Sequence, residues 1–183
     1  MYKIKAPNKS IFLSSVFITG FSSVSLQLIM LREFLVAFSG NEMVLGILMA
    51  LWMLLSAMGA WLGGKIKLFS RHLAIPLLHL FMLLGSIAAV YSLPLLVNAL
   101  LSPGESGSIL IIAIIALLSL FFFCIASGSV FPIISARQAA AGFQYNGGRL
   151  YGFEAYGSLI GGIVFNIILL IFSMHWLAFF LLI

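Results

Sequence analysis

Long uninterrupted runs of apolar residues dominate this chain of 183 residues and restrict its fold more than any other feature. A run of about 20 apolar residues, wound as an α-helix, matches the hydrocarbon thickness of a bilayer. Inside hydrocarbon every backbone polar group needs an internal hydrogen-bond partner, and a run without alternation meets this need as a helix, not as a barrel strand. The runs therefore predict an all-α, polytopic membrane helix bundle.

The composition argues against a water-soluble domain. Charged residues make up 7% of the chain and hydrophobic residues 63%, whereas an average soluble domain carries about 25% charged residues. The chain has no aspartate, and its four acidic residues are Glu33, Glu42, Glu105 and Glu154. This small number of charges is not enough to hydrate the surface of a soluble domain. We therefore expect the lipid bilayer to be the main partner.

We expect a single transmembrane domain over residues 1–183, with five full spans and a sixth apolar run too short to cross. The spans should end where glycine, proline and polar residues gather, although the first helix could continue to Phe38. The predicted spans cover residues 11–31, 43–62, 73–96, 109–131, 150–172 and, for the partial sixth, 176–183. Because the sixth run breaks off early, the sequence predicts a truncated reading frame or one piece of a split protein.

The positions of lysine and arginine predict the orientation of the spans. If the N-terminus is cytoplasmic, Arg32 alone lies outside and the other eight of the nine basic residues lie inside. Cytoplasmic loops of membrane proteins are enriched in lysine and arginine, so we expect this orientation. The net charge of +5 thus lies at span ends, where it is a topology signal, and we expect no nucleic-acid partner.

Residues that commonly bind metals or carry out catalysis are sparse. Cys124 is the only cysteine, and His72, His79 and His175 lack the spacing of metal ligands. The paired glycines lie at or within predicted spans, without the strand–loop–helix unit that binds a nucleotide. We therefore predict no catalytic residue, no metal site and no cofactor for this chain alone.

Four polar residues are candidate functional groups against this apolar background. Gln27 lies about one and a half turns inside the first span and needs a hydrogen-bond partner on another helix. Arg32 lies near the outer interface, where the simplest interpretation is an interfacial anchor, and Glu42 belongs to the same outer stretch. Glu154 lies about one turn inside the fifth span, a costly position that suggests a function, although it could also reach the cytoplasmic interface.

Small residues at helical spacing predict two faces for helix packing. In the fifth span Gly157 and Gly161 form a GxxxG pair, and small residues repeat that spacing at positions 158 and 162. In the second span Gly59 and Gly63 lie among further small residues at positions 56, 60 and 64. Such faces let another helix approach closely.

Several short segments, taken in order, resemble one known family. They are QLIMLRE at 27–33, GNE at 40–42, GAWLGG at 59–64, SGSVFP at 127–132, and the residues at 148–151, 154–158 and 161–162. Together they are similar to the membrane-embedded, spermidine synthase-like proteins of bacteria, in which several N-terminal spans precede a cytoplasmic aminopropyltransferase-like domain. The resemblance covers nearly the whole chain and implies a multi-pass protein of the bacterial inner membrane.

The catalytic part of that family has no counterpart in this sequence. There it is a Rossmann-like domain with a glycine-rich nucleotide loop and acidic residues that hold the substrates, and this chain has neither that loop nor any aspartate. The resemblance therefore implies a non-catalytic membrane module that anchors or serves an aminopropyltransferase-like domain, soluble or fused, that is absent from this chain.

Two other functions and one open question remain at this point. Six spans could form half of a transporter or permease for a small solute, including a cationic one, and Glu154 would then line its path. The chain could also be a structural subunit of a membrane complex, which would explain the small-residue faces equally well. A homo-oligomer also stays open.

Overall fold

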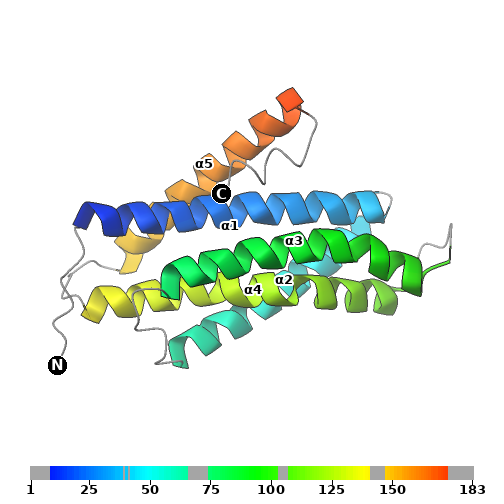
Figure 1. Ribbon diagram of the computed structural model, residues 1–183, viewed down its shortest axis with the longest axis horizontal. Helices are drawn as coiled ribbons and strands as arrows, with labels where there is room; N and C mark the ends of the chain where they lie inside the picture. The colour runs from blue at the N-terminus through cyan, green and yellow to red at the C-terminus, as the bar shows by residue number, and fades with distance from the viewer. Residues whose placement is uncertain are drawn as a thin grey trace. The chain divides into compact units, whose positions relative to one another are not determined.

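Five α-helices form the described part of the chain, which contains no strand (Figure 1). The computed structural model describes residues 9–38, 40, 42–65, 74–102, 107–140 and 147–172. In chain order the helices are α1 (Lys9–Ala37), α2 (Glu42–Lys65), α3 (Ala74–Leu100), α4 (Ile109–Ala140) and α5 (Gly147–Phe172). The prediction of an all-α fold is confirmed. Glu105, His72, His175 and the predicted partial span at 176–183 lie outside the described residues.

Four helices are long and apolar enough to cross a membrane. These segments are Phe12–Ala37, Glu42–Lys65, Ile75–Leu100 and Ile109–Ala139, with 26, 24, 26 and 31 residues. Each exceeds the length of about 20 residues that a hydrocarbon core requires. Helix α5 has 26 residues, but it carries Arg149, Glu154 and Asn166 between its apolar residues, and its crossing stays a prediction.

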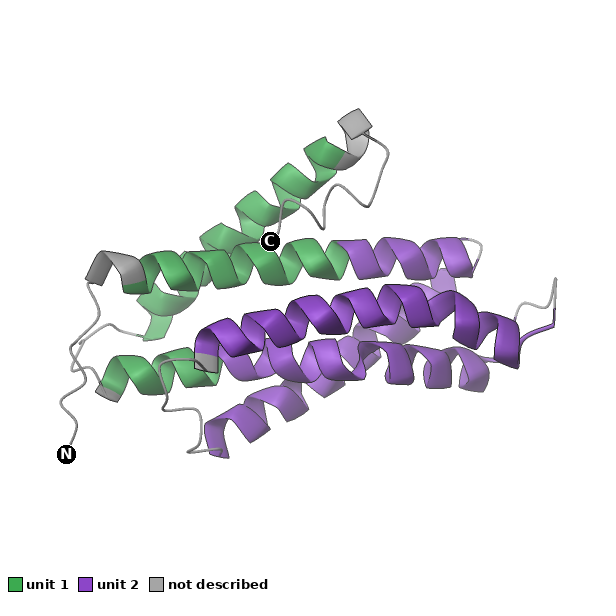
Figure 2. Ribbon diagram, viewed as in Figure 1, with its two compact units in different colours: residues 1–28, 131–183 green, residues 29–130 purple. Residues whose placement is uncertain are grey.

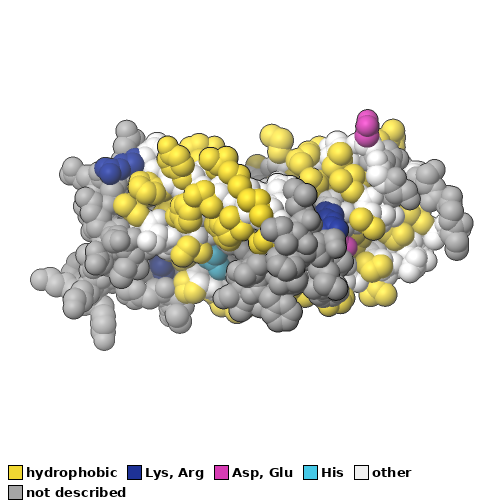
Figure 3. Space-filling model, turned by 90° about the horizontal axis from the view of Figure 1, so that it is seen from above, with side chains coloured by type: hydrophobic (Ala, Val, Ile, Leu, Met, Phe, Trp, Pro, Cys, Tyr) yellow, Lys and Arg dark blue, Asp and Glu magenta, His cyan; other side chains and the backbone are white. Residues whose placement is uncertain are grey.

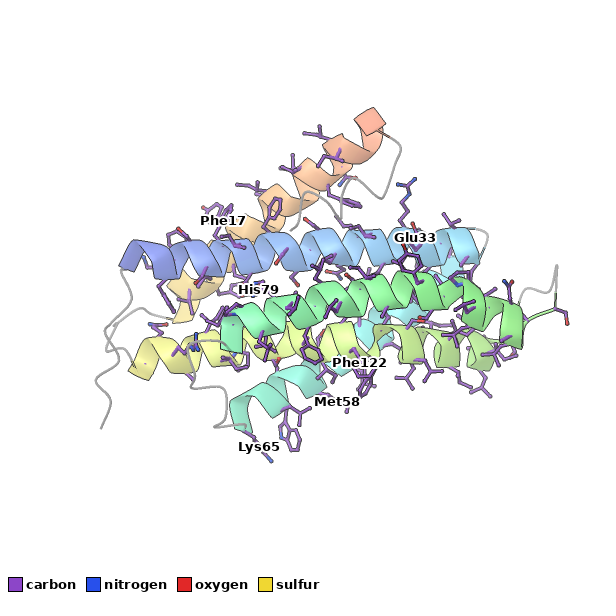
Figure 4. All side chains as sticks on the ribbon, in the orientation of Figure 1. Phe17, Glu33, Met58, Lys65, His79 and Phe122 are labelled. Atoms are coloured by element: carbon purple, nitrogen blue, oxygen red, sulfur yellow. The ribbon has the colours of Figure 1, made fainter. Side chains whose placement is uncertain are left out.

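Large apolar side chains cover the outer faces of the helices. Met53 on α2, Leu95 on α3 and Leu110 on α4 are 74%, 70% and 70% exposed. Figure 3 shows hydrophobic side chains spread over the face that it draws, with few charged groups among them. Met58 on α2 and Phe122 on α4, both labelled in Figure 4, are also exposed. Water would not tolerate so large an apolar surface, which indicates contact with lipid.

The helices run further than the predicted spans: α2 ends at Lys65 rather than at residue 62, and α3 ends at Leu100 rather than at residue 96. The fourth span was predicted to end at residue 131, before Pro132, whereas α4 continues to Ala140. A proline removes one intrahelical hydrogen bond, and the residues beyond it, Ile133 and Ile134, are buried and hold the helix through their packing. Helix α3 contains Pro94, which the predicted span 73–96 already included. The predicted extension of the first helix past residue 31 is confirmed, since α1 ends at residue 37.

The chain divides into two compact units (Figure 2). Unit 1 comprises Met1–Leu28 and Phe131–Ile183, and therefore contains the first part of α1, the end of α4 and the whole of α5. Unit 2 comprises Ile29–Val130, and therefore contains the end of α1, α2, α3 and most of α4.

Phe123 of α4 lies at the centre of unit 2 and is fully buried. Its ring meets that of Trp52 on α2 edge to face, with 5.1 Å between the ring centroids. Its backbone nitrogen lies 3.1 Å from the position that a Cβ atom would take on Gly85 of α3. One residue of α4 thus joins α2 and α3, because an aromatic ring fills one side and a glycine leaves room on the other.

The adjacent phenylalanines of α4 allow a matched test of this core. Phe123 is 0% exposed and Phe122 is 61% exposed. We expect Phe123→Ala to destabilise the protein by roughly 3 kcal/mol, the low end for a buried phenylalanine, because lipid removes part of the transfer penalty but not the cavity. Phe122→Ala should change stability by about 0.5 kcal/mol or less. Unfolding in mixed micelles, followed by circular dichroism, measures both, and equal losses would contradict this description of the core.

Candidate functional site

Helices α2 and α4 approach each other through glycines on both sides. A Cβ atom on Gly59 of α2 would collide with the carbonyl oxygen of Ile125 on α4. In return, a Cβ atom on Gly128 of α4 would collide with the carbonyl oxygen of Ser56 on α2. Only residues without side chains let two helix backbones come this close, and the Cα–H groups then contact the opposite carbonyls.

The contact continues one turn further along α2, on one face of that helix. The carbonyl oxygen of Ser129 lies 2.8 Å from the position of a Cβ atom on Gly63. A Cβ atom on Gly64, the next residue, would meet nothing within 4 Å. Of the small residues that the sequence grouped on α2, Gly59 and Gly63 therefore lie against α4, whereas Gly64 does not.

A second contact of the same kind joins α1 and α5 within unit 1. A Cβ atom on Gly20 of α1 would collide with the carbonyl oxygen of Glu154 on α5. A Cβ atom on Gly157 of α5 would collide with the carbonyl oxygen of Phe17 on α1, whose position Figure 4 marks. Each helix thus supplies both a glycine and a carbonyl to the other.

Two further groups extend this second contact. The position of a Cβ atom on Gly161 lies 2.7 Å from the carbonyl oxygen of Phe21 and 3.1 Å from Oγ of Ser25. The hydroxyl of Ser158 donates a hydrogen bond to the carbonyl oxygen of Gly20 at 3.3 Å. The adjacent glycines Gly161 and Gly162 therefore differ. Gly161 packs tightly against α1, whereas a Cβ atom on Gly162 would have only Val24 Cγ1 near it, at 3.9 Å.

The four polar candidates do not form a common cluster within either unit. Gln27 is half-buried on α1 in unit 1. Arg32 is half-buried on α1 in unit 2, and its Nη1 atom is buried without a hydrogen-bond partner among the described residues. Glu42 is exposed at the first position of α2, where its charge favours the positive end of the helix dipole. Glu154 is half-buried on α5, and its backbone carbonyl meets Gly20 of α1.

A small hollow in unit 2 has an acidic residue at its edge. It lies between α1 and α3, has an empty volume of about 130 Å³, and is lined by Met30, Glu33, Phe34, Ala89, Val90 and Leu93. Glu33 is its one charged residue (Figure 4). The hollow has no space that a water-sized sphere can occupy, so it is not a binding site for a small solute.

Metal chemistry finds no support in the part of the chain that the structure describes. No three residues among its histidines, cysteines and acids lie close enough together to hold a metal ion. Cys124 is fully buried. The arrangement that the described residues do form is two close helix contacts, one between α2 and α4 and one between α1 and α5, which can hold these helices together.

Sequence reasoning missed one half of each contact. It singled out Gly59, Gly63, Gly157 and Gly161, but it did not identify Gly20 on α1 or Gly128 on α4 as the glycines of the facing helices. The available signal was an isolated glycine inside a long apolar helix, where it costs about 1 kcal/mol relative to alanine and therefore suggests a packing role.

Comparison of the chain with known protein families, with curated proteins and with solved structures finds no match. The similarity to spermidine synthase-like membrane proteins therefore stays a prediction from the segments in the sequence.

Two adjacent glycines of α5 test the second contact. We expect Gly161→Ala to destabilise the α1–α5 pair, because the added methyl would meet backbone and hydroxyl oxygens at 2.7 and 3.1 Å. Gly162→Ala has the same gain in helix propensity, about 0.5–1 kcal/mol, and adds only an ordinary contact at 3.9 Å. Thermal unfolding in detergent should give a lower Tm for the first variant and an equal or higher Tm for the second. If Gly161→Ala is as stable as Gly162→Ala, the described contact is wrong.

Proposed function

We propose that this chain is a non-catalytic integral membrane module that anchors or serves an aminopropyltransferase-like domain. The observation that carries the proposal is the pair of glycine contacts, α2 with α4 and α1 with α5, in which helix backbones meet directly. The glycines at these contacts hold the helices together, because they let the helix backbones approach closely. A rigid helical scaffold of this kind suits an anchor.

The segments that resemble the spermidine synthase-like family are largely those that make these contacts. Gly59 and Gly63 belong to the segment at 59–64, and Gly128 belongs to that at 127–132. Gly157 and Gly161 belong to the segments at 154–158 and 161–162. This coincidence supports the proposal, because a shared packing pattern is what related membrane modules would retain.

We further propose five full spans, with α5 as the fifth, and a cytoplasmic N-terminus in the bacterial inner membrane. The end of α2 supports this orientation. Lys65 Nζ lies 3.8 Å from the centroid of the Trp61 ring, and both side chains are exposed. Tryptophan and lysine are typical of the membrane–water interface, and lysine is typical of its cytoplasmic side.

The transport hypothesis has less support from the geometry. A cationic solute would need carboxylates around a cavity, and Glu154 does not line the hollow that the described residues form between α1 and α3. The hollow beside Glu33 has no room for a small solute. A purely structural subunit stays an alternative, and the presence or absence of an enzyme partner separates it from the proposal.

Cysteine labelling tests the proposed orientation. In a Cys124→Ala background, Glu42→Cys at the start of α2 should react with a membrane-impermeant maleimide added to intact spheroplasts. Lys65→Cys at the end of the same helix should react only after the membrane is permeabilised. The parent variant, which has no cysteine, is the control for background labelling. The opposite order of labelling would contradict a cytoplasmic N-terminus.

Partner capture and amine uptake test the function itself. We expect the tagged full chain to co-purify with an aminopropyltransferase-like protein, and Glu154→Gln to keep both that partner and the wild-type expression level. Proteoliposomes that contain either form should take up no more labelled spermidine than protein-free vesicles. Uptake by the wild type that Glu154→Gln abolishes would replace the anchor proposal by transport. Failure to capture any synthase-like partner would leave the structural subunit.

A further inference from the structure

The two compact units are joined within helices. The chain passes from one unit to the other between Leu28 and Ile29 in α1 and between Val130 and Phe131 in α4 (Figure 2). Each of these helices therefore packs within one unit along its first part and within the other unit along its second part. A change in the angle between the units would have to be taken up by bending of α1 and α4.

In α4 the change of neighbours takes place over two residues. Ser129 lies against α2, where its carbonyl oxygen is 2.8 Å from the position of a Cβ atom on Gly63. Phe131 lies against α5, where its ring meets that of Tyr151 edge to face, with 6.3 Å between the ring centroids. The first contact belongs to unit 2 and the second to unit 1. The two units thus hold α4 on either side of Val130.

The backbone of α4 is weakened at the same point. Pro132 lies inside the helix and has no N–H to donate to the carbonyl oxygen of Gly128, so one of the hydrogen bonds that would join the two parts of α4 is missing. The hydroxyl of Ser129 donates a hydrogen bond to the carbonyl oxygen of Ala126 at 2.8 Å, where it competes with the backbone bond. Prolines and glycine–serine pairs are the positions at which long helices usually kink.

Helix α1 is softened in the turns before its own passage between the units. The hydroxyls of Thr19, Ser22 and Ser25 donate hydrogen bonds to backbone carbonyl oxygens three or four residues earlier, at 2.8, 3.2 and 2.8 Å. Such bonds compete with the backbone ladder and often bend a helix. Ser25 is three residues before Leu28, the last residue of α1 in unit 1. Both connecting helices therefore have groups that favour bending next to the boundary.

Helix α3 gives a contrast within the same chain. It also contains a proline, Pro94, but the whole of α3 belongs to unit 2. The residues before and after Pro94 therefore pack within one unit. Bending at Pro94 would change the shape of α3 without turning one unit against the other.

We infer that the turn Gly128–Pro132 of α4 is a hinge about which the angle between unit 1 and unit 2 changes, while α1 bends to follow. Hinges are short stretches at helix breaks or ends that absorb the movement of packed bodies on either side. Such motions take place in microseconds to milliseconds. A ligand or partner that binds better to one angle than to another would select it. The inference goes beyond the proposed function and needs no synthase-like partner.

Distances between spin labels in lipid nanodiscs test the hinge. In the Cys124→Ala background, Met53→Cys on α2 and Tyr156→Cys on α5 place one label in each unit at an exposed position. Double electron–electron resonance on frozen samples should give a distance distribution with more than one component. Pro132→Ala supplies the missing N–H, and we expect it to reduce the distribution to one component. A single narrow component in the parent, or equal distributions with and without Pro132, would overturn the inference.

Two controls separate a hinge from a general softness of the helices. Pro94→Ala makes the same change in α3 and should leave the distribution between the two units unchanged. Met53→Cys paired with Leu118→Cys, both exposed and both in unit 2, should give one narrow component in every variant. If Pro94→Ala narrows the distribution as much as Pro132→Ala does, or if the pair within unit 2 is equally broad, the hinge is refuted.

A second substitution guards against an effect of the lost proline ring on packing. Pro132→Leu also supplies the N–H but replaces the ring with a larger side chain. We expect it to narrow the distribution between the units as Pro132→Ala does, because both restore the backbone hydrogen bond to Gly128. A narrow distribution in one of these variants and an unchanged one in the other would show that side-chain packing, not the missing bond, sets the angle, and would refute the hinge.

Discussion

Direct contact between helix backbones at glycine is the interaction on which both units of this structure depend. Lipid tails are as apolar as leucine side chains, so burial of apolar surface cannot by itself hold two helices together in a membrane. What remains is the dispersion and the weak Cα–H···O attraction that act only at short range. Gly59 with Gly128, and Gly20 with Gly157, remove the side chains that would keep the backbones apart.

Reciprocity makes these contacts specific. Each helix presents a glycine beside a carbonyl oxygen, so the two helices fit in one register along their length. In unit 1 the hydroxyl of Ser158 adds a hydrogen bond to the carbonyl of Gly20, a group that also accepts a bond within its own helix. In unit 2 the ring of Phe123 meets that of Trp52 edge to face, so aromatic packing also joins α4 to α2. Small and large residues therefore have complementary roles in the same helices.

The surroundings of two polar residues on α5 become visible only in the structure. Glu154 attracts attention in the sequence, because a carboxylate within a span is costly, and in the structure its backbone carbonyl meets Gly20 of α1. Asn166 drew no attention in the sequence, since one asparagine among many apolar residues matches no motif. In the structure its side chain is exposed and donates a hydrogen bond to the carbonyl oxygen of Gly162.

The sequence by itself determined that the chain is all-α and where its helices lie, because the length of an apolar run and the glycines and prolines around it act locally along the chain. It could not determine how far α4 continues past Pro132, since the packing of Ile133 and Ile134 decides that. Nor could it separate Gly161 from Gly162, which have the same neighbours in sequence. Only the tertiary structure decided which of them faces α1, because α1 and α5 lie more than a hundred residues apart in the chain and the crossing of two helices selects one face of each.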